Sequence, residues 1–260
     1  MINVLGISAS PRKGGNSAFL LERALQGANE AHPSEVTTLA WGFPGKTIAH
    51  CTACDACNRN GGHCTTHDDF QDLVDLWIEA DAVIYSAPVY HMGLPSQLRA
   101  FMDRMGTSTL FRFGAAPNEP LPQKLLKPIG AIVQGNGFAS GQEQAMQQVV
   151  AHAVLMGCVP VVADDWEASL GVAGTTGFDL AKDAIKSHAA AGEALAEGSV
   201  RGARALGRSA VEMALLLHAG AEVRGDVMAS SDIYSELRRR TSEGPSSLFA
   251  ERVSAEEGAK

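Results

Sequence analysis

Short apolar runs alternate with helical patterns from Ile2 to Ala163, and this alternation restricts the chain to a small set of folds. Runs with strand character lie at Ile2–Ser8, Glu35–Ala40, Ala82–Ser86, Pro128–Gln134 and Cys158–Ala163. Helical patterns separate them, at Asn16–Glu30, Asp68–Ala80, Pro95–Met105 and Gln142–Met156. Because parallel strands need such crossovers, the alternation predicts an α/β fold whose five-stranded parallel sheet is covered by helices on both faces.

Composition and charge exclude several classes of function. The 260 residues are 45% hydrophobic and 19% charged, as in compact globular proteins. The net charge is −8, so the chain lacks the excess of basic residues that binding to nucleic acid requires, and nucleic acid is not an expected partner. The chain opens without a basic and apolar leader, and its longest uncharged run, Gln144–Ala163, is interrupted by Gly157 and Pro160. We expect a cytoplasmic protein without a membrane partner.

The pattern changes after residue 177, where the chain becomes rich in Ala and Glu and shows no further strand signal. Helices are expected at Phe178–Ala196, Arg204–Val223 and Asp226–Arg240. The apolar stripe around Val211–Leu217 is not needed by a sheet already covered on both faces. It predicts a homo-oligomer, a dimer or tetramer, in which residues 178–240 contribute contacts. Residues 241–260 are polar and are expected to form a flexible tail.

The loop after the first strand has the composition of a phosphate-binding site. It reads Ser-Ala-Ser-Pro-Arg-Lys-Gly-Gly-Asn-Ser over residues 8–17 and opens a helix, whose first N–H groups are free to bind an anion. It matches neither the P-loop pattern nor the dinucleotide pattern G-x-G-x-x-G. The candidate ligands of a phosphate are Ser8, Ser10, Arg12, Asn16 and Ser17.

Two further loops follow the third and fourth strands, on the same expected edge of the sheet. Pro88 has no N–H and fixes its own backbone, so the amides from Val89 to Met92 are expected to face outward toward the flat polar edge of a ligand. Tyr90 and His91 are candidates to lie against that ligand, with packing inside the protein as the alternative. The candidate residues in these loops are Pro88, Val89, Tyr90, His91, Met92, Gly93, Gly135, Asn136 and Gly137.

Four of the five cysteines lie close together, at Cys51, Cys54, Cys57 and Cys64. In a reducing compartment this density indicates metal or redox chemistry rather than disulfides. The first two intervals are those of bacterial ferredoxin loops, whereas the last is longer and passes through a Gly-Gly turn. An iron–sulfur cluster, a zinc ion and a loop without metal are the three alternatives for these cysteines.

Two segments resemble a known family. Residues 8–17 resemble the phosphate loop of the flavodoxin-like NAD(P)H-dependent FMN reductases. Residues 86–104, which contain Pro-Val-Tyr and later Pro-Ser-Gln-Leu-Arg-Ala-Phe-Met-Asp-Arg, are similar to that family's strand–loop–helix segment. The cysteine pattern resembles the iron–sulfur flavoproteins, a branch of the family that carries a [4Fe–4S] cluster beside FMN. The resemblance extends over about residues 1–165.

The resemblance implies a flavodoxin-like FMN-binding domain at residues 1–177, with the cysteine loop at 51–64 and a helical extension at 178–240. It implies an oxidoreductase that passes electrons from NAD(P)H, or from a reduced ferredoxin-like partner, to a small acceptor such as a quinone or flavin. The four cysteines would hold a [4Fe–4S] cluster. A non-catalytic electron carrier between proteins is the alternative. No catalytic acid, base or nucleophile is expected, because the flavin itself supplies the redox chemistry.

Overall fold

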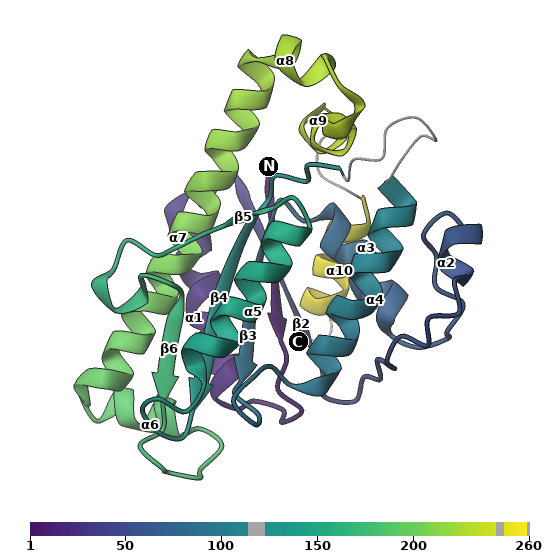
Figure 1. The fold of residues 1–260 in the computed structure, drawn as a ribbon. Helices are drawn as coiled ribbons and strands as arrows, with labels where there is room; N and C mark the ends of the chain where they lie inside the picture. Colours follow the sequence, from purple (N-terminus) through teal and green to yellow (C-terminus); the bar gives the residue numbers. More distant parts are fainter. Residues whose placement is uncertain (114–122, 243–246, 259–260) are drawn as a thin grey trace.

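The strands form one parallel sheet in the computed structural model, which describes residues 1–113, 123–242 and 247–258. The strands are β1 (Ile2–Ser8), β2 (Val36–Gly42), β3 (Ala82–Pro88), β4 (Pro128–Gly135), β5 (Val159–Pro160) and β6 (Val172–Thr175). Their order is β2-β1-β3-β4-β5, and β6 also pairs with β4 (Figure 1).

The strands β5 and β6 share one edge of β4. β5 pairs with the start of β4, at Pro128 and Ile129, and β6 pairs with its end, from Ile132 to Gly135. Together they occupy the fifth position of the sheet, so the predicted five-position parallel sheet is confirmed. The strand predicted at Cys158–Ala163 is shorter than expected because the chain leaves the sheet after Pro160, and β6 was missed.

Helices connect the strands. They are α1 (Asn16–Ala31), α2 (Ala56–Arg59), α3 (Phe70–Glu79), α4 (Ser96–Phe113), α5 (Gln142–Leu155), α6 (Ala184–Ala190), α7 (Ala194–Val223), α8 (Gly225–Ala229), α9 (Ser235–Ser242) and α10 (Ser247–Gly258). Short 3-10 turns lie at η1 (Trp166–Ala168) and η2 (Asp232–Tyr234). None of the described helices combines the length and the apolar character needed to cross a bilayer.

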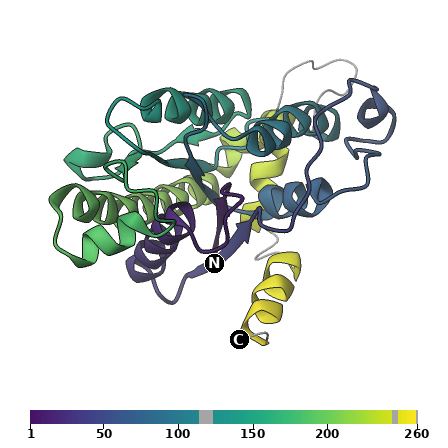
Figure 2. The same cartoon turned by 90° about the horizontal axis from the view of Figure 1, so that it is seen from below.

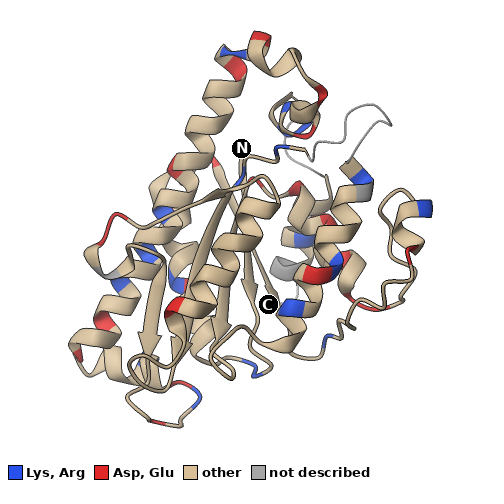
Figure 3. Ribbon diagram, viewed as in Figure 1, with Lys and Arg blue, Asp and Glu red and all other residues tan. Residues whose placement is uncertain are grey.

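Helices cover both faces of the sheet (Figure 2). Leu5, Tyr85 and Val133 point to the face covered by α3, α4 and α5, whereas Val4 and Ile84 point to the face covered by α1 and α7. Alternate residues of a strand point to opposite faces, so a strand buried on both faces reads as a continuous apolar run. The strands accordingly contain no charged residue, and the sheet is uniformly tan in Figure 3.

Helix α7 packs directly on α1, and two glycines make the contact close. A Cβ atom on Gly207 would lie 1.9 Å from the carbonyl oxygen of Ala24, and one on Gly27 would lie 2.1 Å from that of Arg204. Only glycine allows the two backbones to approach in this way. The predicted boundary at residue 177 therefore does not separate two packing units.

The apolar stripe of α7 is mostly covered within the chain. Val211 and Ala214 are buried against α1 and the sheet, whereas Leu216 is 68% exposed. Burial of the stripe removes most of the argument for subunit contacts through residues 178–240, so assembly stays a prediction. Light scattering at micromolar concentration tests it: we expect at least the mass of a dimer, and a monomer mass would contradict it.

The flexible tail predicted at 241–260 is wrong for the part of it that the structure describes. Thr241 and Ser242 complete α9, and α10 follows. The ring of Phe249 is fully buried in the core beneath α10, and Arg252 forms an ion pair with Asp72 of α3. These two side chains dock the last helix on α3, although its sequence is largely polar.

We expect the Gly207→Ala variant to lower the free energy of unfolding by about 1–3 kcal/mol, because the added methyl group collides with the backbone of α1. The matched control is Gly220→Ala in the same helix, where nothing lies within 4 Å of the added carbon. This control is expected to be neutral or to stabilise the protein by up to about 1 kcal/mol. Urea denaturation followed by circular dichroism measures both, and equal stabilities would contradict the packing of α7 on α1.

Candidate functional site

The loops that follow β1, β3, β4 and β6 meet at the carboxyl edge of the sheet and enclose a cavity of about 220 Å³. All three loops singled out in the sequence contribute to its lining. The predicted residues that line it are Ser10, Arg12, Asn16, Pro88, Val89, Tyr90, Gly135 and Asn136. The parallel sheet thus brings together segments that lie more than a hundred positions apart, as expected for ligand sites of α/β sheets.

Six other predicted residues do not line this cavity: His91, Met92 and Gly93, which belong to the turn described below, and Ser8, Ser17 and Gly137. Ser8 lines a neighbouring groove between α1 and β2. Ser17 is fully buried and its hydroxyl oxygen accepts a hydrogen bond from Gln134 Nε2 at 2.6 Å, so it organises the site from behind. Gly137 lies against the ring of Phe178, where a Cβ atom would come within 2.8 Å of that ring.

The loop after β3 forms a tight turn between Tyr90 and Gly93. The N–H of Tyr90 donates to the carbonyl of Gly93 at 2.9 Å, and the reverse bond is 3.0 Å long. His91 and Met92, at the corners of the turn, have φ values of +48° and +65°, a region that is unfavourable for residues with a side chain. Backbone strain of this kind occurs often at ligand-binding positions, which agrees with the place of this turn beside the cavity.

The turn determines which backbone N–H groups remain free to bind a ligand. The N–H of Val89 donates to the carbonyl of Gln134 at 2.8 Å, and that of Tyr90 is used within the turn. The expectation that all amides from Val89 to Met92 face a ligand is therefore wrong for the first two. Within the described residues, the N–H groups of His91 and Met92 make no backbone hydrogen bond.

A fourth segment, which the sequence analysis did not single out, completes the lining of the cavity. It follows β6 and contributes Thr176, Asp179, Leu180, Ala181 and Lys182. The pairing of β6 with β4 determines its position, because Thr175 lies opposite Gly135. A four-residue strand containing a glycine carries almost no periodic signal, so this segment could not be found from the sequence pattern.

The lining of the cavity contains polar groups without protein partners. Gln134 Oε1 and Thr176 Oγ1 are buried and make no hydrogen bond. Buried polar atoms are seldom left unpaired in folded proteins, so these two indicate a ligand with complementary groups. The side chains of Arg12 and Lys182 also lack an ion pair among the described residues, and two such cations favour an anionic ligand.

A wider groove of about 730 Å³ begins beside this cavity. Met92 and the exposed ring of Phe138 lie on its wall, together with residues from the start of α5, from β6 and from α7. Among the described residues that line it, Glu143 is the only charged one. The groove therefore suits an uncharged or weakly polar molecule.

The cysteine loop, which contains α2, lies on the outer side of α4 (Figure 1). It encloses a separate pocket of about 250 Å³. Its lining includes Cys51, Cys54, Cys57 and Cys64. As predicted, a Gly-Gly turn brings the fourth cysteine back, with φ values of +58° at Gly61 and +89° at Gly62. The sulfur atoms surround the pocket rather than one point: among the described residues, no three potential metal ligands converge on a single ion position.

Arg104 of α4 lies beneath this pocket with only 3% of its surface exposed. Its Nη2 donates to Cys64 Sγ at 3.2 Å, its Nη1 donates to Asp68 Oδ2 at 2.5 Å, and its guanidinium lies 4.0 Å from the ring centre of Phe70. Burial alone would raise the pKa of Cys64, but the N–H of Thr66 and the Arg104 side chain outweigh it and lower that pKa.

The other thiols differ in their surroundings. The pKa of Cys54 is lowered, chiefly by the N–H of Ala56, whereas burial raises the pKa of Cys57. Metal ligands and nucleophiles are thiolates, and the surroundings of Cys54 and Cys64 favour that form.

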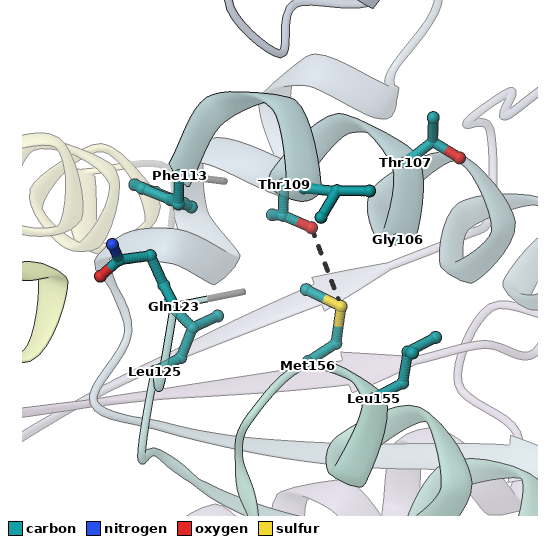
Figure 4. Close-up of a pocket in the computed structure, with 9 residues that line it drawn as sticks. Gly106, Thr107, Thr109, Phe113, Gln123, Leu125, Leu155 and Met156 are labelled. Atoms are coloured by element: carbon teal, nitrogen blue, oxygen red, sulfur yellow. Dashed lines mark hydrogen bonds between the residues drawn. The ribbon is translucent and has the colours of Figure 1, made fainter. Parts of the chain in front are cut away.

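A further cavity of about 300 Å³ lies between α4 and α5 (Figure 4). Thr109 donates to Met156 Sδ at 3.8 Å across it, and Leu125 and Leu155 contribute apolar walls. Within the part of the chain that the structure describes, no charged residue lines it. Because α4 runs antiparallel to the strands, this cavity lies at the opposite end of the helix from the Tyr90 turn and contains none of the predicted site residues.

Comparisons with known proteins agree with this geometry. The sequence pattern of the NADPH-dependent FMN reductases matches residues 2–167. An iron–sulfur flavoprotein of Methanocaldococcus jannaschii is 32% identical over 174 residues, which cover 66% of this chain and 82% of that protein.

Two solved structures show the same fold. RosB, solved with bound 8-demethyl-8-formylriboflavin-5′-phosphate, superimposes with a TM-score of 0.63 at 14% identity, covering 88% of this chain and 86% of RosB. A flavodoxin, WrbA-like protein from Agrobacterium tumefaciens superimposes with a TM-score of 0.50 at 16% identity, covering 83% of this chain and 99% of that protein. The chain therefore belongs to the NADPH-dependent FMN reductase family and is an NAD(P)H-dependent FMN oxidoreductase with a flavodoxin-like fold.

Proposed function

We propose that the chain binds FMN at the carboxyl edge of its sheet and uses it to pass electrons from NAD(P)H, or from a reduced ferredoxin-like protein, to a small acceptor such as a quinone or flavin. The observation that carries this proposal is the convergence of three predicted loops on one cavity with unpaired polar groups. Sites for whole small molecules usually measure roughly 300–1,000 Å³. A cavity of about 220 Å³ therefore suits the phosphate and ribityl end of FMN, with the ring over the Tyr90 turn.

Different residues around the cavity bind different parts of FMN. Ser10, Arg12 and Asn16 surround the phosphate, aided by the free N–H groups at the start of α1. Gln134 and Thr176 bind the ribityl hydroxyls with their unpaired oxygen atoms. When bound, FMN supplies hydride and single-electron chemistry. The protein orients it and tunes it through hydrogen bonds, and no side chain is needed as a proton donor.

The wider groove beside the cavity is the proposed entrance for the acceptor. It adjoins the Tyr90 turn through Met92, and Phe138 offers an exposed aromatic face for stacking. Since Glu143 is the one charged residue among the described residues of its lining, the groove favours an uncharged quinone or flavin ring over a phosphorylated acceptor.

We further propose that Cys51, Cys54, Cys57 and Cys64 hold a [4Fe–4S] cluster. Four thiols around a pocket of about 250 Å³ suit a group larger than one ion, and Arg104 offsets their negative charge. The distance along α4 from Ser96, which lies beside the Tyr90 turn, to Arg104 is about 12 Å. A cluster at that separation would allow the two electrons of a hydride to leave one at a time.

The alternative considered for this chain, an electron carrier between proteins, differs in its acceptor, which would be a partner protein instead of a small molecule. Both functions use the same cofactors, so the distinction is kinetic. Steady oxidation of NAD(P)H with a quinone or free flavin as acceptor supports the oxidoreductase. Reduction that proceeds only through a partner protein supports the carrier.

The FMN site is tested by the double variant Ser10→Ala and Asn16→Ala. Each lost hydrogen bond to a charged phosphate removes about 1.5–3 kcal/mol of binding free energy, so the affinity for FMN is expected to fall by at least tenfold. Quenching of flavin fluorescence measures the dissociation constant, and Ser254→Ala, on the exposed surface of α10, is the control. Undiminished affinity, or purified protein that contains FAD, would contradict the proposed site.

The cluster is tested by the variant Cys57→Ser, prepared anaerobically together with the wild type. We expect the variant to lose iron and inorganic sulfide while it retains FMN, because the phosphate loop is separate from the cysteine pocket. Metal analysis and an ultraviolet–visible spectrum report both cofactors. Cys158→Ala, at a buried position away from the loop, should keep its iron. Wild-type protein with full FMN but no iron, or with zinc and no sulfide, refutes the cluster.

A further inference from the structure

Residues 176–185, which we call the cover segment, run from β6 into the first turn of α6 across the first loop of the site. Hydrogen bonds tie the segment to the loop after β4: the N–H of Thr176 donates to the carbonyl of Gly135 at 3.1 Å, and that of Phe178 donates to the carbonyl of Asn136 at 2.6 Å. The segment then turns back over the cavity through Gly177 and Phe178, both with positive φ.

The far end of the cover segment is held by the phosphate loop. The N–H of Ile185, in the first turn of α6, donates to Asn16 Oδ1 at 3.0 Å. The carbonyl of Lys182 lies 3.4 Å from where a Cβ atom on Gly15 would be, so the two backbones are in contact. The cover segment is therefore bonded at both ends to loops that line the cavity.

The bond to Ile185 fixes the orientation of Asn16. Because its Oδ1 accepts from this N–H, the Nδ2 group of the same amide is turned toward other partners and can only donate. A phosphate oxygen is an acceptor, so this orientation is the one that a phosphate needs. The cover segment thus positions a residue of the first loop as well as lining the cavity itself.

The charges on the two sides of the cavity are consistent with an anion between them. Arg12 lies on the first loop and Lys182 on the cover segment, and neither has an ion pair among the described residues. Among the described residues of the lining, Asp179 is the one carboxylate, and it accepts a hydrogen bond from the N–H of Ala181 at 2.9 Å and makes one with His188 Nε2 at 3.1 Å. The two cations, Arg12 and Lys182, outnumber this carboxylate, so the net charge of these side chains around the cavity is positive.

We propose that the cover segment is a fourth FMN-binding element, in which Lys182 binds the phosphate and Thr176 binds the ribityl chain. The inference rests on the proposed FMN site and deepens it. The family pattern ends at residue 167, so the segment lies outside the part of the chain that identifies the family.

The test compares Lys182→Met with Lys186→Met, which removes the same charge from an exposed position on α6 that does not line the cavity. FMN and riboflavin are titrated into each apoprotein. Lys182→Met is expected to raise the dissociation constant for FMN at least tenfold and to leave that for riboflavin unchanged, because riboflavin has no phosphate. Lys186→Met should match the wild type with both ligands.

A second variant, Thr176→Val, keeps the shape of the side chain and removes its hydroxyl. It is expected to weaken FMN and riboflavin alike, since both carry the ribityl chain. In wild-type protein, hydrogen exchange of the amides in residues 176–185 should slow when FMN is added.

The outcomes separate the two proposals. If the wild type binds FMN but Lys182→Met binds it as tightly as Lys186→Met does, the cover segment is not a phosphate-binding element and the proposed function stands. Unchanged hydrogen exchange in residues 176–185 on addition of FMN also overturns the inference. If the wild type binds no FMN, the proposed function and the inference both fail.

Discussion

Hydrogen bonding of β4 to strands on both of its edges determines where the ligand cavity lies. On one edge, β3 delivers Pro88 beside Gln134, and on the other, β6 delivers Thr175 beside Gly135. Because these strands are parallel, the loops that follow them all begin at the same edge of the sheet. Strand pairing alone is therefore sufficient to bring the three loops and the cover segment together.

The sequence predicted those parts of the site that lie next to a strand or helix with a clear apolar pattern. The first strand and helix bracket a loop whose Ser10 and Asn16 are recognisable by type, and the glycines after β4 follow a long apolar run. The cover segment could not be predicted, because its position depends on a strand of four residues and on Ile185 contacting Asn16 across 169 positions. Local pattern carries no information about contacts of that range.

The same limit explains the errors about the C-terminal region. An apolar stripe on α7 indicates burial but does not say against what, and within the chain most of it packs on α1 and the sheet, while assembly stays a prediction. A single ring, Phe249, anchors α10, and one aromatic residue in a polar stretch is too weak a signal for a docked helix. The Gly-Gly turn of the cysteine loop was predicted correctly because a positive φ is a local property.

The close contact between α1 and α7 has a consequence for how this protein is divided into modules. The family pattern ends at residue 167, yet β6 and α7 lie beyond it and cover the edge of β4 and the apolar face of α1. A chain cut at that point would present an open strand edge beside exposed Leu21 and Leu25, the combination that drives aggregation. Recombination, fusion or circular permutation of this protein must therefore respect a unit that extends at least through Val223, well past the limit drawn by sequence similarity.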